Sequence, residues 1–302
     1  MINLIAPILF LCIIPVITKI ASIKRYNIAI ILLLNYFFAS AVSFVIAMQQ
    51  SLFTIFPLLS ISNLEEITTG NSLPNTALLC LSVGVSSGIF FYLNLLFSQK
   101  SIMSNGMGIS SFFSHIGFIG AIFAGVVFWN EELNAIHWVA IAGILLALFI
   151  LVGNLKVLKI QSPMLLSFLL LCGTVIEVNN KVFSRYAISS YEPMFLAIAF
   201  FTAFIVAGIY SVYKKKQLGT SFSFNRWEVV CGLILGSSNM LNSYFKLKSL
   251  EELPSGVVFP TLSASGLIFS TLFGILIFKE KTNWKHIVSM LIATICIILI
   301  NI

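Results

Sequence analysis

Aspartate is absent from this 302-residue chain, and charged residues of all kinds make up only 9% of it. Soluble domains carry roughly 25% charged residues, so this chain has too few to cover a surface that faces water. Apolar residues amount to 59%, and 28 residues are phenylalanine. The composition therefore excludes an ordinary soluble domain and predicts a protein whose solvent is lipid.

Residues for catalysis, metal binding and nucleotide binding are also scarce. The three histidines are scattered, and the ten acidic residues are all glutamates. The five cysteines fall inside apolar runs without CxxC spacing, so we interpret them as small core residues. No P-loop or dinucleotide-binding glycine motif occurs in a strand–helix context. We therefore expect no cofactor and no metal, and neither an enzyme nor an ATP-driven pump.

The net charge of +7 comes from basic residues in short loops between apolar runs. Positive charge beside membrane helices sets their orientation, so we expect no nucleic-acid partner. Of the 17 Lys and Arg residues, 13 fall in loops on the face opposite the two termini. The positive-inside rule makes that face cytoplasmic and places both termini outside.

Ten apolar runs are long enough to cross a bilayer, which takes about 20 residues, with a range of about 17–25. The runs are continuous rather than alternating, which predicts helices. They cover residues 2–20, 27–47, 75–98, 102–128, 136–154, 162–182, 191–212, 227–246, 254–278 and 284–301. The first run lacks the basic start and cleavage site of a signal peptide, so we expect a retained helix. In the longest connection, 48–74, residues 51–59 are too short to span and are expected to lie at the interface.

The two halves of the chain resemble each other in order and spacing. The matches, all offset by 148 to 160 positions, pair Cys12 with Cys172, Arg25 with Arg185, Tyr26 with Tyr186, Asn94 with Asn242, Gly106 with Gly256, Phe128 with Phe278 and Glu131 with Glu280. Five helices per repeat is an odd number, so equivalent loops should lie on opposite membrane faces. We predict two inverted five-helix repeats, 1–155 and 156–302, a common plan of secondary transporters.

Two stretches carry a family resemblance. The stretch from Phe128-Trp-Asn-Glu-Glu to the Gly143 helix resembles the end of an EamA-type repeat, with an acid just after the fourth helix. The stretch from Ser255-Gly-Val-Val-Phe-Pro to Phe278-Lys-Glu resembles its second copy. The resemblance covers essentially the whole chain and implies the drug/metabolite transporter (DMT) superfamily. It implies ten helices in two inverted repeats, with a central cavity between helices 1–4 and 6–9 and with helices 5 and 10 at the periphery. It also implies that both termini lie inside, whereas the charge count places them outside.

Glu177 is the most informative single residue. It lies inside the run 162–182, and ionisable groups at membrane depth are costly and usually functional. Asn180 lies one turn on, and Lys181, at i+4, can reach Glu177 on the same helix face. One interpretation gives Glu177 a coupling proton or a substrate ammonium. The other is a Glu177–Lys181 pair that merely packs the bundle, and the residues leave both open.

Neutral polar residues make up the rest of the predicted cavity. His115, near Ser111 in the run 102–128, can hydrogen-bond a substrate, relay a proton or bond a neighbouring carbonyl. The others lie on helices expected to face the cavity, and are Asn35, Tyr36, Tyr92, Asn94, Ser238, Asn239 and Asn242. Hydrogen bonds between membrane helices contribute only about 0.6–2 kcal/mol, so packing is the alternative for each residue.

Charged residues near the ends of the runs have a different interpretation. We expect Lys246, Lys248 and Arg185 to snorkel at the interface, with attraction of an anionic substrate as the alternative. We interpret Glu131 and Glu280 as acids outside the membrane that oppose a helix dipole.

Taken together, these patterns predict a secondary transporter, an exporter or exchanger that moves a small metabolite across the cytoplasmic (inner) membrane by alternating access. Its partners would be the small-molecule substrate, the lipid bilayer and, if transport is proton-driven, a coupling proton. We expect the protein to act as a monomer or a homodimer. The alternatives are a lipid-carrier flippase and a membrane assembly subunit without transport.

Overall fold

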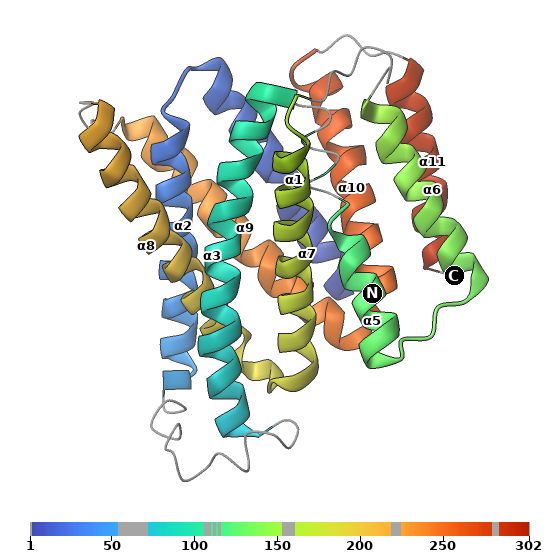
Figure 1. Cartoon of the computed structure of the whole chain (residues 1–302), viewed down its shortest axis with the longest axis horizontal. Helices are drawn as coiled ribbons and strands as arrows, with labels where there is room; N and C mark the ends of the chain where they lie inside the picture. The colour runs from blue at the N-terminus through green and yellow to red at the C-terminus, as the bar shows by residue number, and fades with distance from the viewer. Residues whose placement is uncertain are drawn as a thin grey trace. The chain divides into compact units, whose positions relative to one another are not determined.

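The computed structural model describes residues 2–53, 72–105, 110, 113, 116–152, 161–218, 225–279 and 284–301. In these residues the chain forms ten α-helices, one short 3-10 helix and no strand (Figure 1). The helices are α1 (Ile2–Ile23), α2 (Ile28–Gln49), α3 (Leu73–Asn105), α5 (Phe118–Trp129), α6 (Ala135–Val152), α7 (Pro163–Tyr186), η5 (Ser189–Tyr191), α8 (Glu192–Leu218), α9 (Arg226–Glu252), α10 (Ser255–Leu276) and α11 (Trp284–Ile300). Each predicted apolar run contains one of them.

Five segments are long and apolar enough to cross a membrane. They are Leu4–Ala21, Ile28–Gln49, Leu73–Ser98, Pro163–Tyr186 and Ser189–Tyr213. Shorter apolar helices cover Phe118–Trp129, Ala135–Ile150 and Ile287–Ile300. The all-helical, multi-pass architecture is thereby confirmed, while the figure of ten spans stays a prediction. The predicted interfacial segment falls almost wholly outside the described residues.

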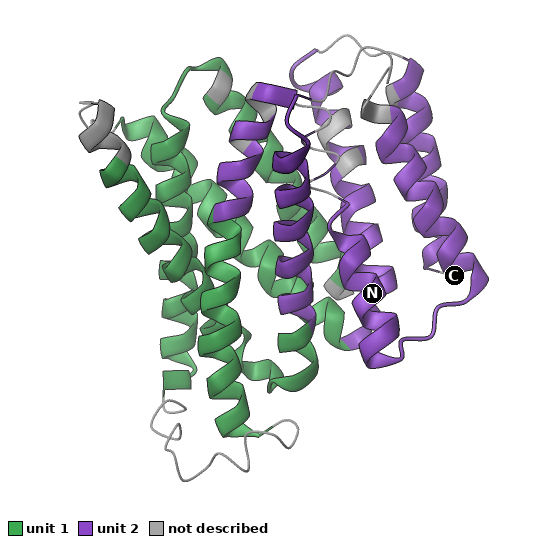
Figure 2. Cartoon of the chain, viewed as in Figure 1, with its two compact units in different colours: residues 1–92, 182–251 green, residues 93–181, 252–302 purple. Residues whose placement is uncertain are grey.

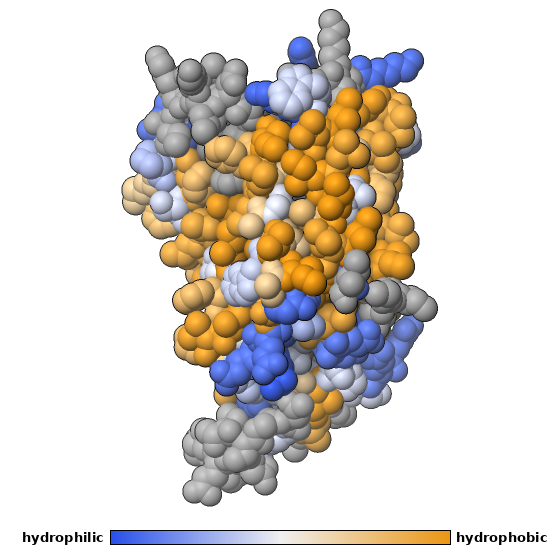
Figure 3. Space-filling view, turned by 90° about the vertical axis from the view of Figure 1, so that its right-hand side faces the viewer, coloured by the Kyte–Doolittle hydropathy of each residue, from blue (hydrophilic) through white to orange (hydrophobic). Residues whose placement is uncertain are grey.

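Large apolar side chains remain exposed along these helices. Leu9, Phe128, Val139 and Ile209 are each 60% to 75% exposed. On the face shown in Figure 3, apolar residues form a broad field, and hydrophilic residues gather towards its two ends. Monomeric soluble proteins rarely expose apolar patches of this extent, so these side chains are placed to contact lipid.

The boundary between the third and fourth runs differs from the prediction. A connection was predicted between residues 98 and 102, but α3 continues as helix to Asn105. Residues 99–105 include no glycine or proline that would end a helix. The side chain of Asn105 binds the segment just before α7, where its Oδ1 accepts hydrogen bonds from the backbone N–H groups of Gln161 (3.0 Å) and Ser162 (2.9 Å).

The chain divides into two compact units (Figure 2). Unit 1 comprises residues 1–92 and 182–251, and unit 2 comprises residues 93–181 and 252–302, so the boundaries fall inside α3 and α7. Each unit takes helices from both predicted repeats. Three helix pairs join helices that hold the same position in each predicted repeat: α2 with α8 in unit 1, and α5 with α10 and α6 with α11 in unit 2.

Glycines allow two close helix contacts in unit 1. A Cβ on Gly88 of α3 would lie 2.3 Å from the carbonyl oxygen of Ala199 in α8. A Cβ on Gly236 of α9 would lie 2.6 Å from the carbonyl oxygen of Asn35 in α2. Each glycine has a second one four residues earlier, Gly84 or Gly232, which is the small-xxx-small pattern of membrane helix interfaces.

A buried carboxylate holds two helix starts together in unit 1. Glu228 follows the N-cap Asn225 by three residues and accepts a hydrogen bond from its backbone N–H at 3.2 Å, as in a capping box. The other Glu228 oxygen accepts from the backbone N–H of Asn27, the N-cap of α2, at 2.8 Å. The helices α2 and α9 therefore begin at the same end of the unit.

In unit 2, α6 and α11 form a close pair. A Cβ on Gly143 would lie 2.3 Å from the Sγ of Cys296, and the hydroxyl of Ser289 donates to the carbonyl of Ala147 at 2.6 Å. All five cysteines are buried and free, which confirms their interpretation as core residues.

Candidate functional site

The face of α7 that carries Glu177 makes contacts at both ends of α5 in unit 2. One turn before Glu177, the Thr174 hydroxyl donates to the carbonyl of Gly117 at 3.0 Å. One turn after it, the Lys181 ammonium binds Glu131, which follows the end of α5. Residues three and four apart share a helix face, so Glu177 lies on the same face as Thr174 and Lys181, between their contacts with Gly117 and Glu131.

Glu177 is partly buried, and the Asn180 amide donates to its Oε2 at 3.0 Å. The helix Pro163–Tyr186 is one of the five candidate membrane spans. A carboxylate held in this setting can accept a proton or attract a cation. The structure thus brings together two of the predicted cavity residues, Glu177 and Asn180.

Lys181 has a different partner from the one that its spacing suggests. Its Nζ lies 2.5 Å from Glu131 Oε1, and the two side chains are only 7% and 12% exposed. The second Glu131 oxygen accepts from the backbone N–H of Ser255 at 3.0 Å and from the Ser255 hydroxyl. The ammonium of Lys181 is therefore paired with a carboxylate from another part of the sequence, and the Glu177–Lys181 pair stays a prediction.

Local geometry explains how Glu131 reaches that position. Asn130 adopts a left-handed conformation (φ 51°) that ends α5, and the Glu131 N–H bonds back to the Gly125 carbonyl at 3.2 Å. A Cβ on Gly125 would lie 2.6 Å from the Ser255 hydroxyl. Glu131 is thus an acid at a helix N-terminus, as predicted, but the helix is α10, 124 positions away.

In unit 1, several predicted cavity residues bond to neighbouring helices. The Asn239 amide donates to Asn35 Oδ1 at 3.5 Å, next to the close contact of Gly236. The Tyr36 hydroxyl donates to the Phe91 carbonyl at 3.2 Å. These contacts suit helix packing, the alternative that the sequence left open. Tyr92 is buried, with its ring centroid 5.8 Å from that of Tyr210.

Two of the predicted cavity residues, Asn94 and Asn242, have a side-chain oxygen that accepts no hydrogen bond from the described residues. Both oxygens are buried. The two asparagines are equivalent in the predicted repeats. Ser238 is buried, while Ser111 and His115 lie outside the described residues, so their roles stay predictions.

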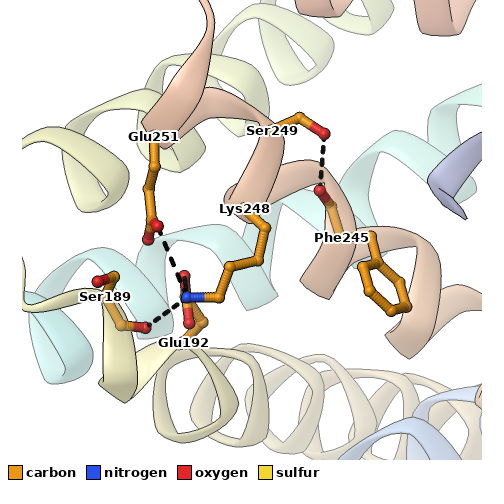
Figure 4. A network of polar contacts seen from close by, with 6 residues as sticks. All are labelled: Ser189, Glu192, Phe245, Lys248, Ser249 and Glu251. Carbon is orange, nitrogen blue, oxygen red and sulfur yellow. Dashed lines mark hydrogen bonds and ion pairs between the residues drawn. The ribbon is translucent and has the colours of Figure 1, made fainter. Parts of the chain in front are cut away.

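The sequence reasoning missed a second charged cluster, in unit 1. The Lys248 ammonium lies 2.8 Å from Glu192 Oε1 and 3.6 Å from Glu251 Oε2 (Figure 4). The structure gives the Lys248 ammonium two carboxylate partners, Glu192 and Glu251, which the interpretation from sequence did not include. The i,i+3 spacing of Lys248 and Glu251 was a signal, whereas nothing in the sequence linked either residue to Glu192. No group of three metal-binding side chains occurs in the described ranges.

Comparisons with known proteins give the family. The model of the EamA-like transporter family matches residues 164–302. The quaternary ammonium compound-resistance protein QacC of Staphylococcus aureus is 34% identical over 98 residues, which are 32% of this chain and 90% of that protein. The multidrug resistance protein EbrA of Bacillus licheniformis is 25% identical over 104 residues, 34% of this chain and 97% of that protein.

The fold also occurs among solved structures. One crystal structure of a protein superposes with a TM-score of 0.70 over 99% of this chain and 94% of the other, at 11% identity. That likeness concerns the fold alone, whereas the match to QacC spans nearly the whole of a relative. With its apolar helices, this chain is a membrane transporter that belongs to the EamA-like transporter family of the drug/metabolite transporter superfamily.

Proposed function

We propose that this protein is a secondary transporter that exports small organic cations, quaternary ammonium compounds among them, across the cytoplasmic membrane by alternating access. The observation that carries the proposal is the Glu177 carboxylate, held by Asn180 inside a candidate membrane span. A carboxylate at that depth offers a cation a compensating charge that lipid does not supply. The names of QacC and EbrA support the same class of cargo.

The helix pairing supports the two-repeat arrangement that alternating access would use. The pairs α2–α8, α5–α10 and α6–α11 each join helices of equal rank. The glycine pairs 84/88 and 232/236 are offset by 148 positions, as are Asn94 and Asn242. Gly88 of α3 contacts α8, and the equivalent Gly236 of α9 contacts α2. Matching contacts of this kind are expected when two repeats are related by an internal two-fold axis. QacC matches almost end to end within a stretch shorter than either repeat.

A thermal-shift experiment on the detergent-purified protein tests cargo binding. We expect benzyltriethylammonium, a quaternary cation with an aromatic ring, to raise the unfolding temperature, and neutral sugars and phosphate esters to leave it unchanged. A ligand at 100 times its Kd stabilises by about 2.7 kcal/mol. In Glu177→Gln the shift should disappear, because the cation has lost its counter-charge.

The matched control is Glu132→Gln, which removes an exposed carboxylate from the loop after α5 and should keep the wild-type shift. An equal shift in wild type and Glu177→Gln would contradict the role of Glu177. Stabilisation by phospholipid and by no soluble compound would favour the lipid-carrier flippase instead.

A further inference from the structure

The cluster of Glu192, Lys248 and Glu251, named here the Glu192 triad, shares no residue with the cargo site proposed above (Figure 4). Glu192 is the first residue of α8 and is 1% exposed. Lys248 and Glu251 lie one turn apart near the end of α9. The Lys248 ammonium also lies 3.4 Å from the carbonyl oxygen of Ser189. One ammonium therefore serves two carboxylates.

The charges of the triad do not balance. With all three groups ionised, it carries a net charge of −1. Glu192, the fully buried member, shares its ammonium with Glu251, whose side chain is 24% exposed, and a buried carboxylate that is only partly paired is costly. In the described residues, no hydroxyl or amide donates to either oxygen of Glu192. A single bound proton makes the triad neutral. If that proton is on Glu192, the fully buried carboxyl group carries no charge.

Among the described residues, Lys248 is the cation that acts on Glu192. Tyr244 of α9 is a further titratable group that faces the triad, with its ring centroid 5.9 Å from Lys248 Nζ. The helix α2, which packs along α8, contains no charged residue between Ile28 and Gln49. In η5 the titratable residue is Tyr191, and at the end of α7 Arg185 is exposed to solvent. The protonation of the triad is therefore decided by its own three groups.

We propose that the Glu192 triad is a proton-binding site, and that its proton is the one exchanged for cargo during transport. On binding, the proton forms an O–H bond with one carboxylate oxygen, Lys248 keeps its own protons, and no other bond changes. The coupling half of this inference rests on the proposed transport function, whereas the proton-binding half does not. Cargo and proton would then use different carboxylates, Glu177 and the Glu192 triad.

Infrared difference spectroscopy of the folded, purified protein tests proton binding without any cargo. Wild type should show a carboxylic-acid carbonyl band at neutral pH, which titrates away at alkaline pH. The band should be lost in Glu192→Gln and also in Glu251→Gln, because either change leaves one carboxylate for one ammonium. In Lys248→Met the band should persist. Glu252→Gln, an exposed neighbour on the same helix end, should match wild type. An unchanged band in both Glu192→Gln and Glu251→Gln would overturn the proposal.

Transport in proteoliposomes tests coupling, with labelled benzyltriethylammonium as the probe. Glu251→Gln should lose uphill accumulation driven by a pH gradient but keep exchange of labelled for unlabelled cation, since cargo binding is intact. Retained uphill accumulation in this variant would refute the coupling role. If wild type moves no cation at all, the proposed function fails, while the infrared result still decides whether the triad binds a proton.

Discussion

Replacing Glu131 with glutamine is expected to lower the free energy of unfolding by about 3–5 kcal/mol, the usual cost of removing one partner from a buried ion pair. The Lys181 ammonium, 7% exposed and 2.5 Å from that carboxylate, would lose its counter-charge. The first turn of α10 would lose the anion that accepts from the Ser255 N–H. The measurement is the unfolding midpoint in mixed micelles as the fraction of denaturing detergent rises.

Two further variants separate charge loss from general damage. Glu132→Gln changes the exposed neighbour and should stay within about 0.5 kcal/mol of wild type. Lys181→Met should cost less than Glu131→Gln, because the remaining carboxylate keeps both donors of Ser255. Equal midpoints for Glu131→Gln and Glu132→Gln would show that the ion pair contributes nothing to stability.

Alanine at Gly88 and alanine at Gly208 are expected to change stability in opposite directions. At Gly88 the new Cβ would lie 2.3 Å from the Ala199 carbonyl oxygen and 2.6 Å from Thr202 Cβ, so α3 and α8 must separate. Overpacking of this kind costs about 1–3 kcal/mol. At Gly208 of α8 nothing lies within 4 Å, and alanine favours a helix by up to about 1 kcal/mol over glycine.

The same unfolding assay extends to Gly236, the equivalent glycine in the second predicted repeat. Gly236→Ala should cost about as much as Gly88→Ala, since its Cβ would lie 2.6 Å from the Asn35 carbonyl oxygen. A neutral Gly88→Ala, or a Gly208→Ala as damaging as Gly88→Ala, would show that these close contacts do not hold the helices together.

Much of the fold followed from the sequence because lipid imposes one simple requirement. A run of about 20 apolar residues without partners must be helical, and each predicted run does contain a helix. The error before Asn105 arose because the polar residues 99–101 resembled a loop, although Gln99 and Lys100 are good helix formers and no glycine or proline follows before Asn105. The glycine pairs 84/88 and 232/236 were visible in the sequence at the repeat offset of 148 and were overlooked.

The candidate site was predictable only where its residues are close in sequence. Glu177 and Asn180 share one helix turn, a spacing that allows their contact. Lys181 also lies within that spacing of Glu177, yet it binds Glu131, because the left-handed Asn130 turns that carboxylate back towards α10. Lys248 and Glu192 are 56 positions apart, and no periodicity reports on such a pair.

Uphill transport of benzyltriethylammonium is the most direct test of the proposed function. Wild type, Glu177→Gln and Glu132→Gln would be reconstituted in vesicles under an imposed pH gradient, with gradient-free exchange measured in parallel. We predict that wild type and Glu132→Gln accumulate the cation, and that Glu177→Gln loses both accumulation and exchange because its cargo site lacks the carboxylate. Wild-type accumulation by Glu177→Gln, or no movement of any organic cation by the folded wild type, would contradict the account.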